Sequence, residues 1–345
     1  MTDLSRREFL RRTAAGVSVL AGGWWLSGCG QPTAPPPAAT SPSPTAANSP
    51  EDPTVAAAPA ANNPTESPTQ ARNSSYPDLV VGRGGEPEEL VRRSLAALGG
   101  IERFVKSGAN VIIKPNICVA YHTYEYAATT NPWVVAALVK LALAAGAGRV
   151  RVLDYPFGGT AEEAYSRSGI QEQVLAAGGE MEIMSKFKFV STDIPAGQDL
   201  RQCDIYADVL QADVLIDVPI AKHHSLARLT LGMKNLLGVI WDRPAIHWNL
   251  GQRVADLTSR VRPTLTVIDA VRILTANGPT GGNLDDVKKL DTIIASPDIV
   301  AADSYAAGLF GLKPDDLAYI QAATAMGLGR SDLSNLKIEE LTVGG

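Results

Sequence analysis

The residue types best suited to chemistry gather in one stretch of the chain, 212–238, which reads ADVLIDVPIAKHHSLARLTLGMKNLLG. An apolar run ends at Pro219, and Lys222, His223 and His224 follow together, although the whole chain contains only four histidines. Lysines beside apolar runs suit the binding of a carboxylate or phosphate group. A histidine next to lysines has a lowered pKa, stays neutral near pH 7 and can act as a general base. The stretch therefore indicates a small anionic molecule as the partner, with acid–base catalysis as one use of the site.

Two further residues extend this group of candidate catalytic side chains. Lys234 falls in LTLGMKNLLG, where burial would lower the pKa of its amine, although an exposed place on an amphipathic helix is the alternative. His247 lies between Trp241 and Trp248, which either wall a pocket or close the core. We expect the catalytic set to be Lys222, His223, His224, Lys234 and His247.

The histidines also allow a metal site. His223, His224 and His247 could together bind a divalent metal, with Asp154 or Asp269 supplying a carboxylate. Adjacent histidines can converge on one ion in an irregular loop, whereas on a strand they point to opposite sides. Their spacing lacks the regularity of a motif such as HExxH, so a metal is an alternative to the anion site.

Polar residues stand at the ends of four apolar runs. VIIKPN ends with Lys114 and Asn116, RVRVLDY carries Asp154 near its end, LTVID ends in Asp269, and VLIDVPI precedes Lys222. One such residue would suit an ordinary solvated loop. Because ligands bind beyond the carboxyl ends of parallel strands, the four ends together predict one shared site.

The candidate substrate-binding residues include both side chains and glycines. Pro115 holds the preceding residue in an extended conformation, which suits a lysine that clamps an anion. The glycines of NGPTGG (277–282) permit close backbone approach, so backbone amides there could meet an anion, although a plain connecting turn is equally consistent. The candidate set is Lys114, Asn116, Asp154, Asn235, Asp269, Gly278 and Gly281.

The elements that would position these residues alternate along the chain. The apolar, β-branched runs predict strands over 79–83, 111–116, 149–155, 181–184, 205–210, 214–220, 265–271 and 289–296. Amphipathic or capped stretches predict helices, chiefly over 86–100, 129–147, 161–169, 170–179, 229–240 and 297–310. Alternation of this kind predicts an α/β fold with a largely parallel, doubly wound sheet and helices on both faces.

The N-terminal 28 residues read as an export signal. Arg6 and Arg7 resemble a twin-arginine signal, and the apolar stretch that follows is too short to span a bilayer. Leu26-Ser27-Gly28-Cys29 resembles a lipobox, in which Cys29 is lipidated, and an ordinary membrane anchor is the alternative. We therefore expect an exported lipoprotein, held by its lipid on the outer side of the cytoplasmic membrane or on another envelope membrane.

Composition separates the rest of the chain into a tether and one domain. Residues 29–75 are rich in Pro, Ala, Ser and Thr and are expected to be a disordered linker. Residues 76–345 are long enough for a single α/β domain. The chain's net charge of −5 argues against a nucleic-acid partner, which would call for a basic face.

Cysteine spacing limits the cofactors. After Cys29 the chain has Cys118 and Cys203 and no CxxC motif, so we expect no iron–sulfur cluster within it. A Cys118–Cys203 disulfide is one alternative, and two separate thiols are favoured. His122, in the tyrosine-rich AYHTYEY, is expected in a surface loop, with a pocket lid as the alternative.

These stretches together resemble a bacterial and archaeal family known as domain of unknown function 362. The resemblance covers about 111–328 and is carried by VIIKPN, ATTNPWVVAALVKLALAAGA, the strand with Asp154, DVLIDVPIAKHHSLARLTLGMKNLLGVI, His247, RPTLTVIDAV, GPTGG and SPDIVAADSYAAGLFG. It implies no activity, because the family's function is unknown. Some relatives carry ferredoxin-like cluster segments, whose cysteines this chain lacks. The arrangement of Lys and His before a Gly-Lys stretch also looks like nickel-pincer lactate racemases, by analogy alone.

Three functions follow from these observations. The first is an envelope enzyme acting on a small anionic substrate, with a deep polar pocket where the candidate residues converge. The second is a metal- or ligand-binding lipoprotein without catalysis. The third is a structural lipoprotein, in which the candidate residues would be scattered. The sequence leans towards the enzyme and leaves its reaction open.

Overall fold

The computed structural model of the chain describes residues 75–344. The expected signal peptide, the lipidation site at Cys29 and all but the last residue of the linker lie outside these residues. No helix within the described part is long and apolar enough to cross a membrane.

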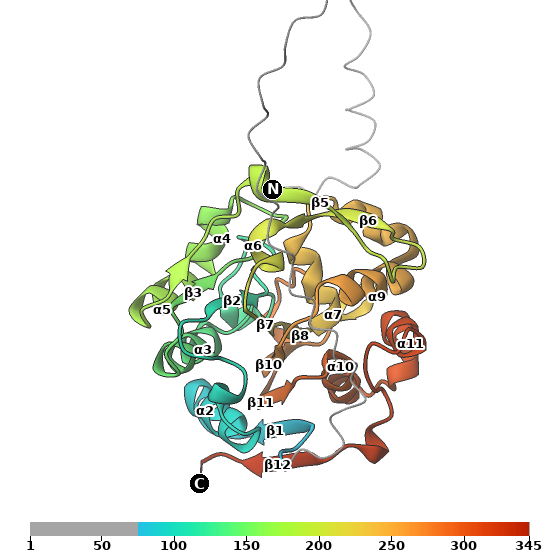
Figure 1. Cartoon of the computed structure of the whole chain (residues 1–345). Coiled ribbons are helices and arrows are strands. Elements are labelled where there is room, and N and C mark those ends of the chain that lie inside the picture. Colours follow the sequence, from blue (N-terminus) through green and yellow to red (C-terminus); the bar gives the residue numbers. More distant parts are fainter. Residues whose placement is uncertain (1–74, 345) are drawn as a thin grey trace, which may run out of the picture. The chain divides into compact units, whose positions relative to one another are not determined.

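A central mixed sheet organises the domain (Figure 1). Its main path runs in the order β12-β1-β11-β10-β7-β2-β3-β4. The strands of this path are β1 (Leu79–Arg83), β2 (Asn110–Pro115), β3 (Arg149–Val152), β4 (Glu180–Met181), β7 (Val214–Val218), β10 (Leu265–Leu274), β11 (Val287–Ser296) and β12 (Ile338–Thr342). From β10 to β4 every neighbouring pair is parallel, whereas β11 is antiparallel to both β10 and β1. The predicted largely parallel α/β sheet is confirmed.

Helices cover both faces of the sheet (Figure 1). On one side lie α2 (Pro87–Ala97), α3 (Pro132–Ala144), α4 (Ala161–Arg167) and α5 (Ile170–Ala176). On the other lie α7 (Gly232–Asn235), α9 (Leu250–Arg260), α10 (Ile299–Ala307) and α11 (Ala318–Ala325), while α6 (Ala207–Leu210) and α8 (Arg243–Ile246) are short. Short 3-10 helices occupy Ile101–Arg103, Tyr124–Tyr126, Lys186–Lys188, Leu236–Val239, His247–Asn249, Leu284–Asp286, Gly308–Phe310, Pro314–Asp316 and Leu333–Asn335.

Two apolar cores result from the alternation of side chains along the strands. Ile112 packs with the α7–α11 side, whereas its neighbours Val111 and Ile113 pack with the α2–α5 side. Successive strand residues point to opposite faces, so a strand buried on both faces must be apolar almost throughout. This explains why these strands read as continuous apolar runs.

Local signals start α3 and α10 where the sequence predicts. The side chain of Asn131 accepts the backbone N–H of Trp133, and Pro132 occupies the first position of α3. The side chain of Asp298 likewise accepts the N–H of Ala301 at the start of α10. These caps fix the loops that follow β2 and β11.

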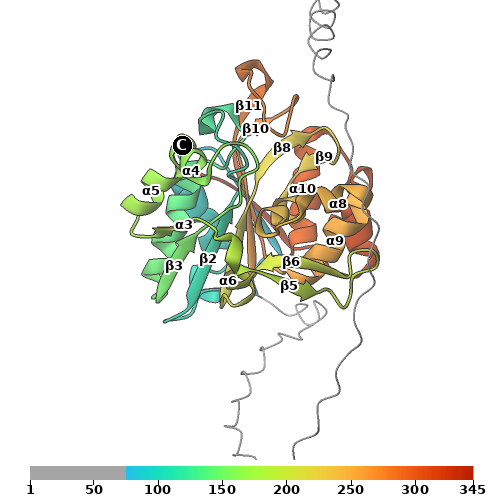
Figure 2. The same cartoon turned by 90° about the horizontal axis from the view of Figure 1, so that it is seen from above.

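The main departure from the prediction lies after Pro219. The strand predicted over 214–220 ends at Val218 as β7, and a further strand, β8 (Ile220–His224), begins after Pro219. β8 pairs with β10 in parallel and with β9 (Arg228–Thr230) in an antiparallel hairpin (Figure 2). The strand predicted over 205–210 is wrong from Ala207 onward, where the chain forms α6. Before it, β6 (Gln202–Tyr206) pairs with β5 (Phe189–Asp193) in a separate two-stranded sheet.

Candidate functional site

A cavity of about 860 Å³ opens at the carboxyl ends of β2 and β3, beside β8, α7 and α8. This is the edge of the sheet at which ligands of open α/β folds bind. Lysine, asparagine, histidine and aromatic side chains line much of it. The lining residues are Lys114, Asn116, Cys118, Asp154, Tyr155, Pro156, Phe157, Lys222, His224, Ser225, Leu226, Thr230, Lys234, Asn235, Leu237, Gly238, Trp241, Arg243, Pro244, His247 and Pro279.

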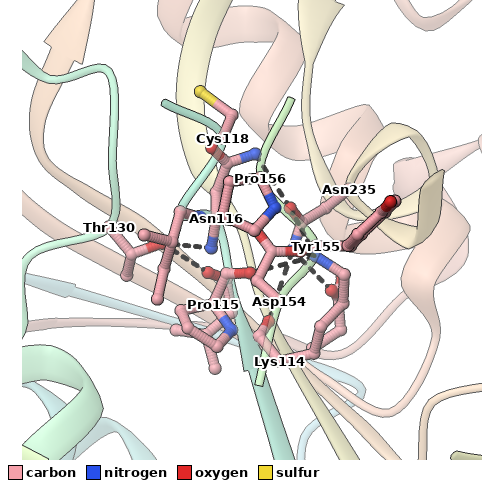
Figure 3. A network of polar contacts seen from close by, with 12 residues as sticks. Lys114, Pro115, Asn116, Cys118, Thr130, Asp154, Tyr155, Pro156 and Asn235 are labelled. Carbon is pink, nitrogen blue, oxygen red and sulfur yellow. Dashed lines mark hydrogen bonds and ion pairs between the residues drawn. The ribbon is translucent and has the colours of Figure 1, made fainter. Parts of the chain in front are cut away.

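The floor of the cavity contains a buried ion pair (Figure 3). Nζ of Lys114 lies 2.8 Å from Oδ1 of Asp154, and it also donates to the carbonyl of Pro115 at 3.0 Å. The other carboxylate oxygen of Asp154 accepts the backbone N–H of Ile117 at 2.6 Å. Both side chains are buried, so their mutual contact replaces the water they would otherwise bind.

Asn235 joins this ion pair to the next strand. Its Oδ1 accepts from Nζ of Lys114 at 3.1 Å and from Nδ2 of Asn116 at 2.9 Å. Its Nδ2 donates to Oδ1 of Asp217 at 2.8 Å. The amide is buried and uses both of its ends, so it holds the floor together and has little capacity left for a ligand.

Lys222 is anchored in the same way. Its Nζ donates to Asn116 Oδ1 at 3.1 Å and to the carbonyls of Ala128 and Pro279 at 2.6 and 3.0 Å, and it contacts Sγ of Cys118 at 3.2 Å. An ammonium has three donors, and these partners occupy them. Lys222 therefore contributes positive charge to the cavity and fixes the surrounding loops.

Lys234 differs from the other two lysines. It is only 7 % exposed, and its ammonium makes no hydrogen bond or ion pair with any residue from 75 to 344. Burial lowers its pKa to about 8, and the positive charges of Lys222 and Arg243 add to the shift. A buried ammonium that lacks a partner and borders a cavity is suited to meeting an anion there.

The hydrogen bonds of His224 determine its tautomer. Its Nδ1 lies 3.1 Å from the backbone nitrogen of Leu226 and 3.3 Å from that of Ala227. Backbone N–H groups can only donate, so Nδ1 accepts and the proton of the neutral ring is on Nε2. Burial lowers the pKa of His224 to about 3, and the positive charges of Lys234 and Lys222 add to the shift. His224 is therefore a neutral hydrogen-bond donor to the cavity.

His247 has the opposite tautomer. Its Nδ1 lies 3.0 Å from the carbonyl oxygen of Arg243, which can only accept, so Nδ1 carries the proton. Nε2 is then left with a free lone pair. Partial burial of the ring, which is still exposed on one side, and the nearby Lys234 ammonium lower the pKa of His247. Of the two cavity histidines, His247 is the one built to accept a proton at Nε2.

The cavity is strongly cationic. Lys114, Lys222, Lys234 and Arg243 line it against the single carboxylate of Asp154, which gives a net charge of +3 with the histidines neutral. Arg243 is held by carbonyls, since its guanidinium donates to the backbone oxygens of Tyr155 and Pro156. Charges of one sign in a concave, partly buried site attract ligands of the opposite sign.

Aromatic side chains form one wall. The rings of Tyr155 and Trp241 stack with centroids 5.5 Å apart, and Phe189 lies edge-on to Trp241 at 5.4 Å. The guanidinium of Arg243 lies 4.6 Å from the centroid of the Tyr155 ring. Trp241 is thus a wall of the cavity, whereas Trp248 is 83 % exposed and does not line it.

The structure brings together most, but not all, of the predicted site residues. Lys114, Asn116, Asp154, Lys222, His224, Lys234, Asn235 and His247 all line the cavity. His223 does not, because adjacent residues of β8 point to opposite sides, and its Nδ1 accepts the N–H of Gly278 at 3.1 Å. The three imidazoles of the metal hypothesis therefore do not converge. Among residues 75–344, no three His, Cys, Asp or Glu side chains are grouped so that they could hold a metal ion.

Asp269 and the glycines lie outside the cavity lining. Asp269 is fully buried within β10, where its carboxylate accepts the backbone N–H groups of Asn131 and Val271. The N–H of Gly278 is used by His223, and that of Gly281 donates to the carbonyl of Asn277. The NGPTGG turn instead supplies the Pro279 carbonyl that binds Lys222.

The structure also settles the smaller predictions about this region. Cys118 and Cys203 are both free thiols, which confirms the favoured alternative. His122 is half-buried and stacks on the ring of Tyr126, with centroids 4.6 Å apart. It does not line the cavity.

Sequence reasoning missed three residues that shape the site. Arg243, in WDRP, adds a fourth cation. Gly238 packs against the ion pair so closely that a Cβ atom would lie 1.9 Å from Asp154 Oδ1. Asp217, inside the apolar run of β7, is fully buried, and burial raises its pKa well above the ordinary value although Lys114 opposes the shift. The polar residue within VLIDVPI was the available signal for Asp217.

Comparison with solved structures gives distant similarities. Lactate racemase apoprotein from Thermoanaerobacterium thermosaccharolyticum matches 62 % of this chain with 11 % identity and a TM-score of 0.39. A Thermotoga maritima protein matches 66 % of it with 12 % identity and a TM-score of 0.36. This chain spans 53 % and 60 % of the lengths of those two chains.

Sequence comparison gives a nearer relative and a family. A thylakoid-associated protein of Synechocystis sp. is 27 % identical over 247 residues, which cover 69 % of this chain and 74 % of the relative. A family model described as domain of unknown function (DUF362) matches residues 111–308. That range holds every strand end and helix that lines the cavity, and the chain belongs to the DUF362 family.

Proposed function

We propose that this protein binds a small anionic molecule in the cavity at the carboxyl edge of its sheet. The observation that carries the proposal is the +3 charge of the cavity together with the unpartnered ammonium of Lys234. An anion placed there would restore the balance of charge, and it would supply the hydrogen bonds that Lys234 lacks.

The residues that line the cavity would take different roles in a reaction. Lys234 and the Nε2–H of His224 would hold the negative charge, and Nε2 of His247 would accept a proton from the bound molecule. Lys114, Asn116, Asp154 and Asn235 would hold the cavity in shape, because their polar atoms already bind one another. This division favours an enzyme that uses acid–base catalysis.

A ligand-binding protein without catalysis is the second candidate. It is favoured by the exposed position of His247, which lies at the mouth of the cavity and not on its floor. The replacement His247→Gln separates the two candidates. An enzyme would keep its affinity for the ligand and lose turnover, whereas a binding protein would keep every measurable property.

Isothermal titration calorimetry with acetate, pyruvate and inorganic phosphate tests the binding proposal directly. We expect at least one of these anions to bind the wild-type chain, and to bind Lys234→Met at least tenfold more weakly. Lys288→Met is the matched control, because Lys288 is an exposed lysine on β11 that does not line the cavity. The proposal fails if no anion binds, or if both variants bind as the wild type does.

We further propose that the domain is tethered to a membrane through a lipid on Cys29. The lipobox-like sequence supports this, as does the thylakoid association of the Synechocystis relative. Mass spectrometry of the protein purified from membranes should find the mature chain beginning at an acylated Cys29. Cys29→Ser should move the protein out of the membrane fraction, and a variant that stays there would overturn the lipid anchor.

A further inference from the structure

Large apolar side chains stand exposed at the rim of the cationic cavity. Phe157, Leu226 and Trp241 line the cavity and are 55, 69 and 42 % exposed. Isolated exposed apolar residues are common on protein surfaces, but several that border one cavity mark a binding surface. These three come from the segment after β3, the β8–β9 turn and the segment before α8, so the fold brings them together from distant parts of the chain.

The rim continues inward along a rigid aromatic wall. Trp241 stacks on Tyr155, and Phe189 and Tyr206 pack behind this pair with ring centroids 5.2 Å apart. The backbone carbonyl of Tyr155 is held by Arg243. Stacked rings held in this way present a flat apolar surface with little conformational freedom left to lose on binding.

Polarity therefore changes along the cavity. The buried end carries the ammonium of Lys234, 7 % exposed, and the donor Nε2–H of His224. The open end carries the exposed apolar rim and the aromatic wall. A volume of about 860 Å³ exceeds what a two- or three-carbon anion can fill.

We infer that the ligand is an amphiphilic anion, with a carboxylate-like head at Lys234 and His224 and an apolar chain or ring that lies along the aromatic wall to the rim. This inference rests on the proposed anion site and names its ligand class. A small, fully polar anion would leave the apolar side chains of the rim exposed to water. An amphiphile covers the rim and the buried cation at once.

A series of carboxylates with one head and growing chains tests the inference. The probes are acetate, butyrate, hexanoate and octanoate, titrated by calorimetry into the full chain carrying Cys29→Ser, which keeps lipid and detergent out of the assay. Burial of one methylene strengthens binding about fourfold when it is complete. Allowing for partial burial, we expect octanoate to bind at least about 100-fold more tightly than acetate.

The two ends of the ligand are tested by different changes. Leu226→Ser and Phe157→Ala should weaken octanoate binding at least fivefold and leave acetate binding unchanged. Both residues are more than half exposed, so these variants are expected to fold. Trp248→Ala is the control, since Trp248 is exposed outside the cavity lining and its loss should change neither ligand. For the head, 1-octanol should bind at least tenfold more weakly than octanoate.

The outcomes separate this inference from the proposed function. Equal affinities for acetate and octanoate would overturn the amphiphile and leave the anion site standing. So would a chain-length dependence that Leu226→Ser and Phe157→Ala do not change. Octanol that binds as tightly as octanoate would overturn the carboxylate head. If neither acetate nor octanoate binds, the anion site itself fails, and the inference fails with it.

Discussion

Lys114 and Asp154 form an ion pair of 2.8 Å whose side chains are only 0 and 3 % exposed, at the end of two neighbouring parallel strands. The pair lies at the floor of the cavity, and Asn235 ties it to Asp217 on the next strand. A buried pair of this kind adds little stability over an apolar pair of equal size, but removal of one partner leaves an uncompensated buried charge. The two residues are therefore expected to depend strongly on each other.

Replacement of Lys114 tests this dependence. We expect Lys114→Met to lower the free energy of unfolding by about 3–5 kcal/mol, because Asp154 then stays buried without its cation. The double variant Lys114→Met/Asp154→Asn should recover part of the loss. Urea unfolding followed by circular dichroism measures both. Lys140→Met is the control, since its exposed ion pair with Glu88 should contribute less than about 1 kcal/mol. Equal losses for the single and double variants would contradict the coupling.

Position 238 packs against this ion pair, and only glycine, which has no Cβ atom, fits there. A Cβ atom at this position would lie 1.9 Å from Asp154 Oδ1 and 2.6 Å from Lys114 Nζ. We expect Gly238→Ala to cost at least about 2 kcal/mol in unfolding free energy, because the added methyl group must displace a buried ion pair. Gly308→Ala is the matched control, since a Cβ there meets no atom within 4 Å. Equal stabilities of the two variants would show that the floor of the cavity can rearrange freely.

The sheet could be predicted from the sequence because its signals are local. Apolar β-branched runs mark the strands, and Asn131 followed by Pro132 marks the start of α3. The strand β8 escaped prediction because Pro219 interrupts the apolar run, and the residues beyond it are held by pairing with β10, far along the chain. Non-local pairing of this kind leaves no mark in the sequence of the strand itself.

The sequence identified which residues belong to the site better than it identified what each of them does there. Strand ends identified Lys114, Asn116 and Asp154, since parallel strands finish at one edge. The prediction that Asp269 lies at a strand end was wrong. β10 continues past it to Leu274, so its carboxylate is inside the strand. The opposite tautomers of His224 and His247 depend on backbone groups that only the folded chain brings to each ring.

The tautomers themselves are open to measurement. In ¹⁵N-labelled protein, two-bond ¹⁵N–¹H correlation spectra should show the proton of His224 on Nε2 and that of His247 on Nδ1. His224 should not titrate between pH 5 and 8, because its pKa is lowered to about 3. His247→Gln and His224→Gln assign the signals. A His224 signal that titrates near pH 6.5 would contradict its burial among backbone donors.

The charge state of Lys234 sets the pH dependence of anion binding. Its pKa of about 8 lies below the ordinary 10.5, so the ammonium is present below pH 8 and is lost as the pH rises through that value. An anion prefers the ammonium, so its affinity should be constant from pH 6 to 7.5 and fall up to about tenfold per pH unit above pH 8. Lys234→Arg keeps its charge over this range and should bind with constant affinity. Calorimetry between pH 6 and 10 measures both proteins, and a wild-type affinity that stays constant to pH 10 would remove Lys234 from the anion site.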